Sequence, residues 1–381
     1  MAKLGMPTVV VKFIEAGIEA IQRSQRGIVA LILEDTKQVI DKLATKTNGN
    51  EVLPNPFLVY TVDDIPEELS DKNKDYILKA LKGYNKPPLK VVVYMMQQGG
   101  DKAGADRFQE PLKAMLTERF DYLAIPTIET AQLEYVATWV KTARENKFKK
   151  IKVVLPGSNA DYEGVINFGN TKVVTADREY KAAEYTARIA GLVAGTNMTQ
   201  SATYAPLTEV IDCDRHTQDE MDTMVNEGKF FIWYDGEKFK MSRAMNSLVT
   251  TSQGKLEGYQ TIKIVDIMDM IYDDIRKTAQ DSYIGKYTND YENKCLLISA
   301  ILGYFKQLEN ERLLQKDYST CEIDCEAVRT YQLSHGLFTK EELAKMSDDE
   351  VKKLDTKKIV FLKAKVRPLD AMEDIQLPIN I

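Results

Sequence analysis

The spacing of hydrophobic residues switches repeatedly between continuous runs and a helical period over the first half of the chain. Short apolar runs predict strands that are buried on both faces, at residues 28–33, 89–96, 122–125 and 151–155. Other stretches repeat apolar residues every three or four positions and predict amphipathic helices, at residues 70–84, 103–118, 129–146 and 179–195. Ala190, Gly191, Ala194 and Gly195 predict that the last of these helices packs closely. Strands and helices that alternate through short links predict a central parallel α/β domain, with helices on both faces of its sheet.

The second half of the chain predicts a different arrangement. Asp235-Gly236 lies between two short β-rich stretches and indicates a hairpin over residues 230–241. Longer helices are predicted at residues 264–278 and 291–314, and a strand at residues 358–366. We therefore expect a C-terminal α+β domain. The expected limits are 1–22 for an N-terminal arm, 23–253 for the α/β domain, 254–368 for the α+β domain and 369–381 for a C-terminal strand arm.

The last residues of the chain alternate strictly between apolar and polar positions. Ile375, Leu377, Ile379 and Ile381 share one face of the predicted strand. Pro378 cannot donate a backbone hydrogen bond, so this strand suits the edge of a sheet. The strand pairs either within its own chain or with another chain, and the pattern alone leaves both possibilities open.

A second strand-forming segment lies near the other end. Residues 8–13 are Thr-Val-Val-Val-Lys-Phe, a β-branched stretch that is too short for a helix. Val9, Val11 and Phe13 would share one face of this strand. The chain therefore has a predicted strand near each end.

Composition excludes several classes of protein. The 381 residues carry a formal net charge of −6, whereas nucleic-acid coats and proteins held on anionic lipid need basic patches. No apolar run approaches the ~18 residues of a membrane span, and no secretory signal opens the chain. Cys213, Cys295, Cys321 and Cys325 lack the spacing of a disulfide framework or a zinc site. We therefore expect reduced thiols in a protein made in the cytosol.

Residues suited to catalysis are sparse. His216 and His335 are the two histidines, which argues against a histidine base or a multi-histidine metal site. No serine lies in a G-x-S-x-G elbow. Adjacent acids such as Asp273-Asp274 point in different directions on a helix and are expected to be solvated surface. We expect no catalytic, cofactor-binding or metal-binding residues, and hence no enzyme.

One loop keeps an enzymatic function open. Gly99-Gly100-x3-Gly104 follows a predicted strand and precedes a helix, which is where phosphate-binding loops lie in doubly wound folds. The spacing differs from G-x-G-x-x-G, and Asp101 and Asp106 would repel a phosphate. A nucleotide-binding α/β enzyme that uses the Gly99–Gly104 loop is therefore the alternative function.

Several stretches resemble, in the same order, the sheath proteins of contractile phage tails. They are RIAGLVAGT at 188–196, QSATY at 200–204, RAMNSL at 243–248, IKIVD at 262–266, YIGKYTN at 283–289 and VFLKAKVRPLDAMEDIQLPINI at 360–381. The resemblance spans most of the chain and is to the compact sheaths of phages and phage-tail-like bacteriocins of Gram-positive bacteria. Many relatives carry an extra β-sandwich domain, for which residues 34–88 are too short and too helical here.

The resemblance implies a structural subunit without catalysis. Subunits of this family stack as six-fold rings around an inner tail tube, and contraction drives the tube through the target envelope. Their two arms add strands to a sheet in neighbouring subunits. The implied arm residues are Val9, Val11, Phe13, Ile375, Leu377, Ile379 and Ile381, and the implied acceptor strand contains Phe361, Leu362, Ala364 and Val366.

The same resemblance implies partners and a location. The partners are further copies of the chain, the inner tail tube protein, and baseplate and tail-terminator proteins, with no direct nucleic acid, membrane or cofactor. The implied location is a virion tail or phage-tail-like particle, made in the bacterial cytoplasm and released by lysis. The central domain is expected to have a subtilisin-like, non-catalytic fold. An adaptor that uses the same arms to form one closed ring is a further alternative.

Overall fold

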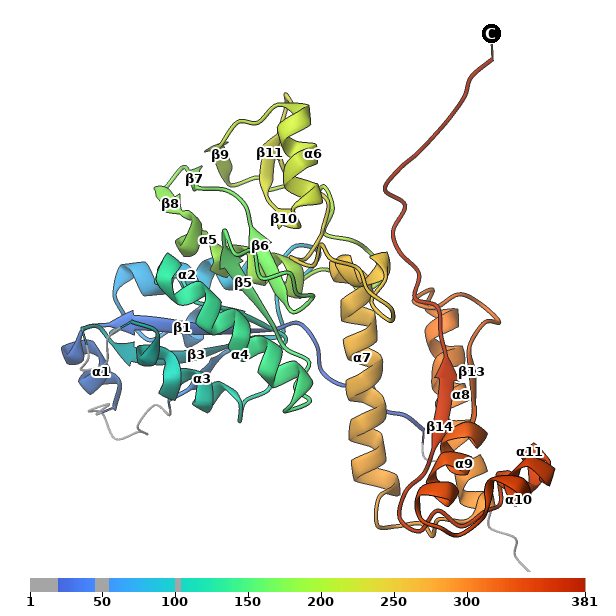
Figure 1. Ribbon diagram of the computed structural model, residues 1–381. Helices are drawn as coiled ribbons and strands as arrows, with labels where there is room; N and C mark the ends of the chain where they lie inside the picture. Colours follow the sequence, from blue (N-terminus) through green and yellow to red (C-terminus); the bar gives the residue numbers. More distant parts are fainter. Residues whose placement is uncertain (1–19, 45–54, 100–103, 381) are drawn as a thin grey trace, which may run out of the picture. The chain divides into compact units, whose positions relative to one another are not determined.

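The computed structural model describes residues 20–44, 55–99 and 104–380 (Figure 1). Contacts divide the chain into two compact units. The first, here called the α/β unit, contains Arg23–Asp273 and the end of the chain from Pro368. The second, here called the α+β unit, contains residues 20–22 and Asp274–Arg367. The predicted arm residues Val9, Val11, Phe13 and Ile381 lie outside the described residues.

A seven-stranded sheet forms the centre of the α/β unit, in the order β10-β6-β5-β4-β1-β3-β2. Its strands are β1 (Ile28–Asp35), β2 (Phe57–Val59), β3 (Lys90–Gln97), β4 (Tyr122–Ala124), β5 (Lys152–Pro156), β6 (Val165–Phe168) and β10 (Lys229–Phe230). All neighbouring pairs are parallel except β2 with β3, so the antiparallel strand lies at an edge. The predicted parallel sheet is confirmed.

Helices cover both faces of this sheet (Figure 1). Leu31 and Leu33 of β1 pack with α2 (Asp71–Leu81) and α5 (Ala182–Ala194). Ala30 and Ile32 pack on the opposite face with α3 (Gln109–Met115) and α4 (Leu133–Glu145). Side chains alternate across a strand, so a strand that is apolar at every position needs a hydrophobic layer on each side.

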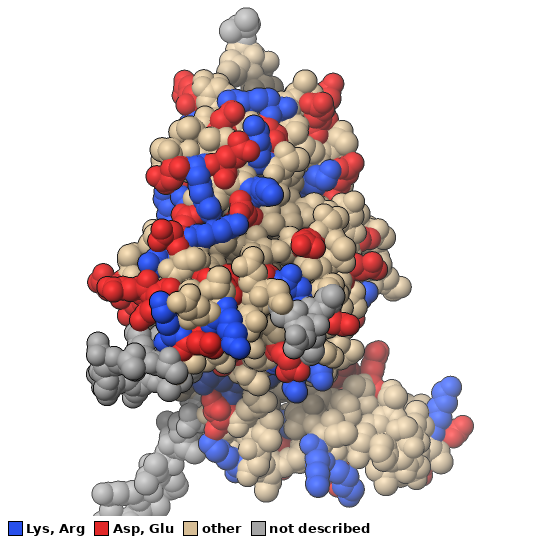
Figure 2. Space-filling model, turned by 90° about the vertical axis from the view of Figure 1, so that its left-hand side faces the viewer, with Lys and Arg blue, Asp and Glu red and all other residues tan. Residues whose placement is uncertain are grey.

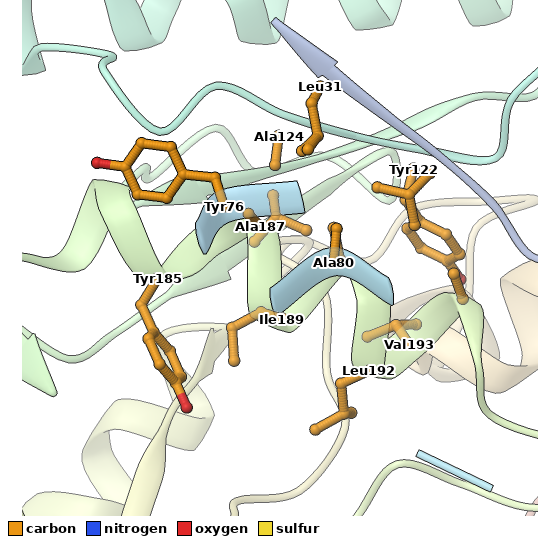
Figure 3. Close-up of a cluster of buried hydrophobic side chains, with 14 of the residues drawn as sticks. Leu31, Tyr76, Ala80, Tyr122, Ala124, Tyr185, Ala187, Ile189, Leu192 and Val193 are labelled. Atoms are coloured by element: carbon orange, nitrogen blue, oxygen red, sulfur yellow. The ribbon is translucent and has the colours of Figure 1, made fainter. Parts of the chain in front are cut away.

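Helix α5 lies against α2 with very little space between the backbones. Figure 3 shows side chains of both helices in this core, including Ala80 and Ala187. A Cβ atom added at Gly191 would lie 2.1 Å from the backbone oxygen of Ala80, and one at Gly195 would lie 2.2 Å from that of Lys86. The close packing predicted from the small residues of α5 is therefore confirmed.

Smaller elements complete the α/β unit. They are the antiparallel sheet of β7 (Lys172–Thr175), β8 (Glu179–Lys181) and β9 (Val210–Cys213), the hairpin of β11 (Ile232–Tyr234) and β12 (Phe239–Met241), the helices α1 (Lys37–Ala44) and α6 (Gln218–Asn226), and the 3-10 turns η1 (Val62–Asp64), η2 (Gly104–Phe108), η3 (Thr130–Gln132) and η4 (Glu257–Gln260). The hairpin falls where Asp235-Gly236 predicted it. The helix predicted at residues 103–118 is instead divided into η2 and α3.

The boundary between the two units falls inside helix α7 (Ile262–Thr278). The further elements of the α+β unit are the π-helical turn η5 (Ala279–Tyr283), the helices α8 (Tyr291–Asn310), α9 (Cys325–Ser334), α10 (Lys340–Lys345) and α11 (Asp348–Val351), and the strands β13 (Thr320–Ile323) and β14 (Leu362–Lys365). Ile323 of β13, Val328 of α9 and Val351 of α11 belong to one hydrophobic cluster of this unit.

We predict that Gly191→Ala destabilises the α/β unit. The new Cβ atom would overlap the backbone of α2, and overpacking of this kind costs about 1–3 kcal/mol. The midpoint of urea unfolding, followed by far-UV circular dichroism, measures the effect. Gly303→Ala is the matched control, because no atom lies within 4 Å of its added Cβ. That control should be neutral or stabilise its helix by about 0.5–1 kcal/mol, and equal losses in both variants would contradict the packing argument.

Candidate functional site: assembly surfaces

The C-terminal segment exposes apolar side chains that the described part of the chain does not cover. Ile375 is 83% exposed, and Leu377 and Ile379 are each 75% exposed. Residues 369–380 belong to neither a helix nor a strand, although the sequence predicts a strand here. Pairing within the chain, one of the two possibilities left open by the pattern, is thus not found among the described residues. This segment needs another surface to become a strand.

An open strand edge lies in the α+β unit. Strands β13 and β14 form a two-stranded antiparallel sheet in which Ile323 pairs with Leu362 and Cys321 with Ala364. The backbone N–H of Asp324 donates to the oxygen of Phe361 at 3.0 Å. Hydrogen-bonded and non-hydrogen-bonded pairs alternate along an antiparallel ladder.

This alternation fixes which backbone groups of β14 face outward. The backbone oxygen of Phe361 points toward β13. The backbone N–H and C=O groups of Lys363 and Lys365, two and four residues later, therefore also point toward β13. Leu362, Ala364 and Val366 therefore direct their N–H and C=O groups to the other edge, where the described residues place no third strand. The family resemblance predicted that these three residues and Phe361 form the acceptor strand. Phe361 lies before β14, and its ring packs near Tyr331 of the same unit.

The arm is attached to the α/β unit at its root. Arg243, just after β12, pairs with Glu373 at 3.3 Å and with Asp374 at 2.6 Å. Glu373 also accepts a hydrogen bond from the Thr203 hydroxyl at 2.5 Å. Sequence analysis gave none of these residues a role, because no local pattern connects groups that lie 170 positions apart.

A buried ionic network attaches α7 to the first residues of the parallel strands. Asp269 accepts two hydrogen bonds from the Arg144 guanidinium, each at 2.9 Å, and one from the Lys152 ammonium at 2.7 Å. One turn earlier, Asp266 pairs with Lys152 at 2.9 Å and accepts a hydrogen bond from the Tyr122 hydroxyl. Lys152 and Tyr122 begin β5 and β4, so the network lies at the amino ends of these strands.

A second arginine extends this network to β1. Arg26, which precedes β1, pairs with Asp121 at 2.9 Å and with Asp273 of α7 at 3.0 Å. Asp121 in turn accepts the backbone N–H of Ile28 at 2.9 Å. Sequence analysis predicted Asp273-Asp274 to be solvated surface, and this was wrong. Asp274 is fully buried and accepts a hydrogen bond from the Tyr304 hydroxyl at 2.7 Å.

The network favours the charged forms of Asp269 and Lys152, whereas burial raises the pKa of Asp266. Burial alone would raise the pKa of Asp269, but the charges of Lys152 and Arg144 outweigh it and lower this pKa to about 2. Burial would lower the pKa of Lys152, but Asp266 and Asp269 raise it. Removing one partner from such a network leaves the other charge buried without compensation.

The residues considered for chemistry are dispersed. His216 packs against Phe231, and His335 ends α9. All four cysteines are free, as expected, and burial raises the pKa of Cys213 to about 12. The described residues contain no group of three or more His, Cys, Asp or Glu side chains that could hold a metal ion. None of the described helices is long and apolar enough to cross a membrane.

The loop of the alternative function is only partly described. Gly99 and Gly104 have φ angles of +67° and +60°, typical of glycine in turns, whereas residues 100–103 lie outside the described residues.

On the face drawn in Figure 2, basic and acidic side chains are interspersed. That face therefore carries no basic patch of the kind that binds phosphate backbones.

Comparison with known proteins places this chain in a family. A family model of the phage tail sheath protein central domain matches residues 101–247, and one of the phage tail sheath C-terminal domain matches residues 255–381. The chain is 32% identical over 382 residues to the tail sheath protein of Clostridium phage phiCD119, with 99% of each chain covered.

Solved structures show the same fold. The sheath tail protein of Desulfitobacterium hafniense superposes with a TM-score of 0.68 at 18% identity, over 83% of this chain and 94% of that chain. The helical sheath of the anti-feeding prophage in its contracted state superposes with a TM-score of 0.67 at 12% identity, over 99% of each chain. The predicted mixed α/β fold is confirmed, and its subtilisin-like character stays a prediction.

The 32% identity over the full length and the matches to both family models identify the family of this chain. The chain belongs to the phage tail sheath proteins and is a structural subunit of a contractile tail sheath. It is thus a component of a phage tail or phage-like particle. The resemblance stated from sequence is confirmed.

We predict that Lys152→Met destabilises the α/β unit by about 3–5 kcal/mol, because Asp266 and Asp269 lose their shared cation. Urea unfolding followed by tryptophan fluorescence measures this loss, since Trp139 and Trp233 both lie in the α/β unit. Lys147→Met is the matched control, because Lys147 is exposed and follows the same helix as Arg144. An equal loss in the control would contradict the importance of the network.

Acid should remove part of the same stabilisation. The folded-state pKa of Asp269, about 2, lies below its ordinary value of 3.8. The ionised group therefore stabilises the fold above about pH 4, and this contribution disappears as the pH falls through about 2. The free energy of unfolding of the unmodified protein should fall over this range more steeply than that of Lys152→Met. Parallel pH profiles would contradict the assignment.

Proposed function

We propose that this chain polymerises into stacked six-fold rings around an inner tail tube and that donated strands link neighbouring subunits. The donor residues are Ile375, Leu377, Ile379 and Ile381 at one end, and Val9, Val11 and Phe13 at the other. The acceptor is the outward edge of β14. One observation carries the proposal: a single chain has both an exposed segment of alternating apolar side chains and an open strand edge.

The two features are complementary in chemistry. The edge of β14 offers unpaired N–H and C=O groups, and Ile375, Leu377 and Ile379 offer side chains for one buried face. Donor and acceptor lie on different parts of the chain, so their contact is heterologous. Repeated heterologous contacts build rings or helical filaments rather than closed dimers. The shared fold with a helical sheath supports this mode of assembly.

Donated strands suit an assembly that contracts. Main-chain hydrogen bonds keep the subunits connected, while the compact units rotate and repack as rigid bodies. In this proposal the work that drives the tube through the target envelope comes from repacking, and the subunit performs no catalysis. The proposed N-terminal and C-terminal arms cover residues 1–22 and 369–381. The two domains proposed between them cover residues 23–253 and 254–368.

The proposed partners follow from this assembly. They are other copies of the chain, the inner tail tube protein, and baseplate and tail-terminator proteins, without direct contact with nucleic acid or membrane. We propose that the subunit is made in the bacterial cytoplasm, assembles there and leaves the cell by lysis. The full-length similarity to a tail sheath protein supports this location.

We predict that Leu377→Asp abolishes polymers and leaves the monomer folded. A charge on the buried face of the donated strand opposes its addition to β14, whereas in the free chain Leu377 is already 75% exposed. Electron microscopy of the purified protein should show long hollow cylinders for the unmodified chain and none for the variant. Circular dichroism checks the fold.

Gln376→Asp provides the matched control. It introduces the same charge one residue earlier, on the opposite face of the strand, and should still form cylinders. Cylinders from Leu377→Asp, or loss of cylinders in both variants, would overturn the proposed donor face. A single closed ring from the unmodified chain would instead support the adaptor alternative.

A further inference from the structure

Residues 369–374 form an extended strap on the α/β unit before the free part of the arm begins. Half-buried Leu369, Ala371 and Glu373 alternate with exposed residues, which is the period expected of an extended chain lying on a surface. From Ile375 onward, every described side chain is exposed. The strap is therefore docked along one face, and the donor residues leave the unit directly after it.

The end of the strap lies in a site that is built for a carboxylate. One oxygen of Glu373 accepts hydrogen bonds from the hydroxyls of Thr203 at 2.5 Å and Ser201 at 3.2 Å. The other oxygen lies 3.3 Å from Nε of Arg243. The backbone N–H of Ala244 donates to the Thr203 hydroxyl at 2.9 Å, which leaves the hydroxyl proton for Glu373. The fold of the unit thus orients a donor toward the strap.

Further charges surround the same site. Arg243 also donates to Asp374 at 2.6 Å. Lys263 is only 6% exposed, and burial lowers its pKa against the opposing effect of Asp370 and Glu373. All acidic residues after the start of the strap lie within the strap itself, and the donor residues carry no charged side chain. Electrostatic attraction therefore holds the strap but not the donated strand.

The ion pair between Arg243 and Asp374 at this site is open to solvent, whereas the side chain of Glu373 is 15% exposed. Arg243 and Asp374 line a groove of about 470 Å³ between α6 and the β11–β12 hairpin, together with Tyr204 and Trp233. The side chains of Arg243 and Asp374 are 39% and 75% exposed. Exposed ion pairs of this kind are individually weak and are screened by salt. The strap is thus held by contacts that can be broken without unfolding the unit.

We propose that Ser201, Thr203 and Arg243 form a carboxylate-binding site for the chain's own Glu373 and act as a releasable latch on the arm. When the latch is closed, the arm starts at Ile375. When it opens, the six residues of the strap add about 20 Å of extended chain to the arm. This inference rests on the proposed strand donation, because the extra length lets a donated strand stay paired while the compact units move apart.

Cleavage by a glutamate-specific protease tests the latch in full-length protein that carries Leu377→Asp and does not polymerise. Cleavage after Glu373 requires the strap to leave the unit and enter the protease as an extended chain. Arg243→Ala or Thr203→Val should accelerate cleavage there about tenfold, as expected for loss of a charge-assisted hydrogen bond. About 1 M salt, which shortens the Debye length to about 3 Å, should accelerate cleavage of the protein with an intact latch.

Two controls isolate the latch. Arg215→Ala removes an exposed arginine that pairs with Asp212 and lies over the rings of Tyr234 and Phe239, away from Glu373, and it should leave cleavage after Glu373 unchanged. Cleavage after the exposed Glu341 should be the same in every variant. Equal rates after Glu373 with and without Arg243→Ala and Thr203→Val would overturn the latch.

Assembled sheaths test whether release accompanies contraction. Glu373 should resist the protease in extended particles and become cleavable in contracted ones. Equal protection in both states would overturn the role of the strap as extra length, and equal cleavage would overturn the latch. Strand donation is judged separately, by whether Leu377→Asp forms cylinders in the electron microscope, so failure of one proposal is distinguishable from failure of the other.

Discussion

Backbone hydrogen bonding is the constraint on which this subunit depends. Peptide N–H and C=O groups that leave water need partners. In the described part of the chain, the outward groups of Leu362, Ala364 and Val366 have no third strand beside them, and the segment after Asp374 joins no sheet. In an isolated protein, such an edge is a liability for aggregation. In the proposed sheath assembly, the same two features would provide a specific and repeatable connection between copies.

If donated strands connect the subunits flexibly, the compact units must keep their own structure while the strands move. The α/β unit meets this need with a sheet covered on both faces and with helix packing so close that Gly191 cannot accept a side chain without a shift. The network around Asp269 fixes α7 to the same sheet. Buried ion pairs contribute little net stability over apolar residues of similar volume, so we infer that this network serves to fix the orientation of α7.

Local pattern predicted the parts of the structure that depend on burial alone. Apolar runs such as residues 28–33 and 89–96 became neighbouring parallel strands, and the small residues of α5 became a close helix contact. The alternation at Ile375, Leu377 and Ile379 indicated a strand without showing its partner, because the pattern of one strand does not identify the strand that pairs with it.

Polar networks between distant segments were not predictable in the same way. Asp266, Asp269 and Asp273 are spaced to share one face of α7, which was an available signal. Their cations come from three separate elements, namely helix α4, strand β5 and the loop before β1. Asp273-Asp274 was therefore mistaken for solvated surface. The site for Glu373 likewise joins the last part of the chain to Thr203, 170 positions earlier, and to Arg243, so only the folded structure brings them together.

Amide hydrogen exchange at β14 tests the central claim most directly. Exchange rates are compared between assembled sheaths and the unpolymerised Leu377→Asp protein. Strand addition predicts that the amides of Leu362, Ala364 and Val366 become strongly protected on assembly, whereas those of Lys363 and Lys365, already directed at β13, change little. Unchanged exchange at the three outward amides in assembled sheaths would contradict the account.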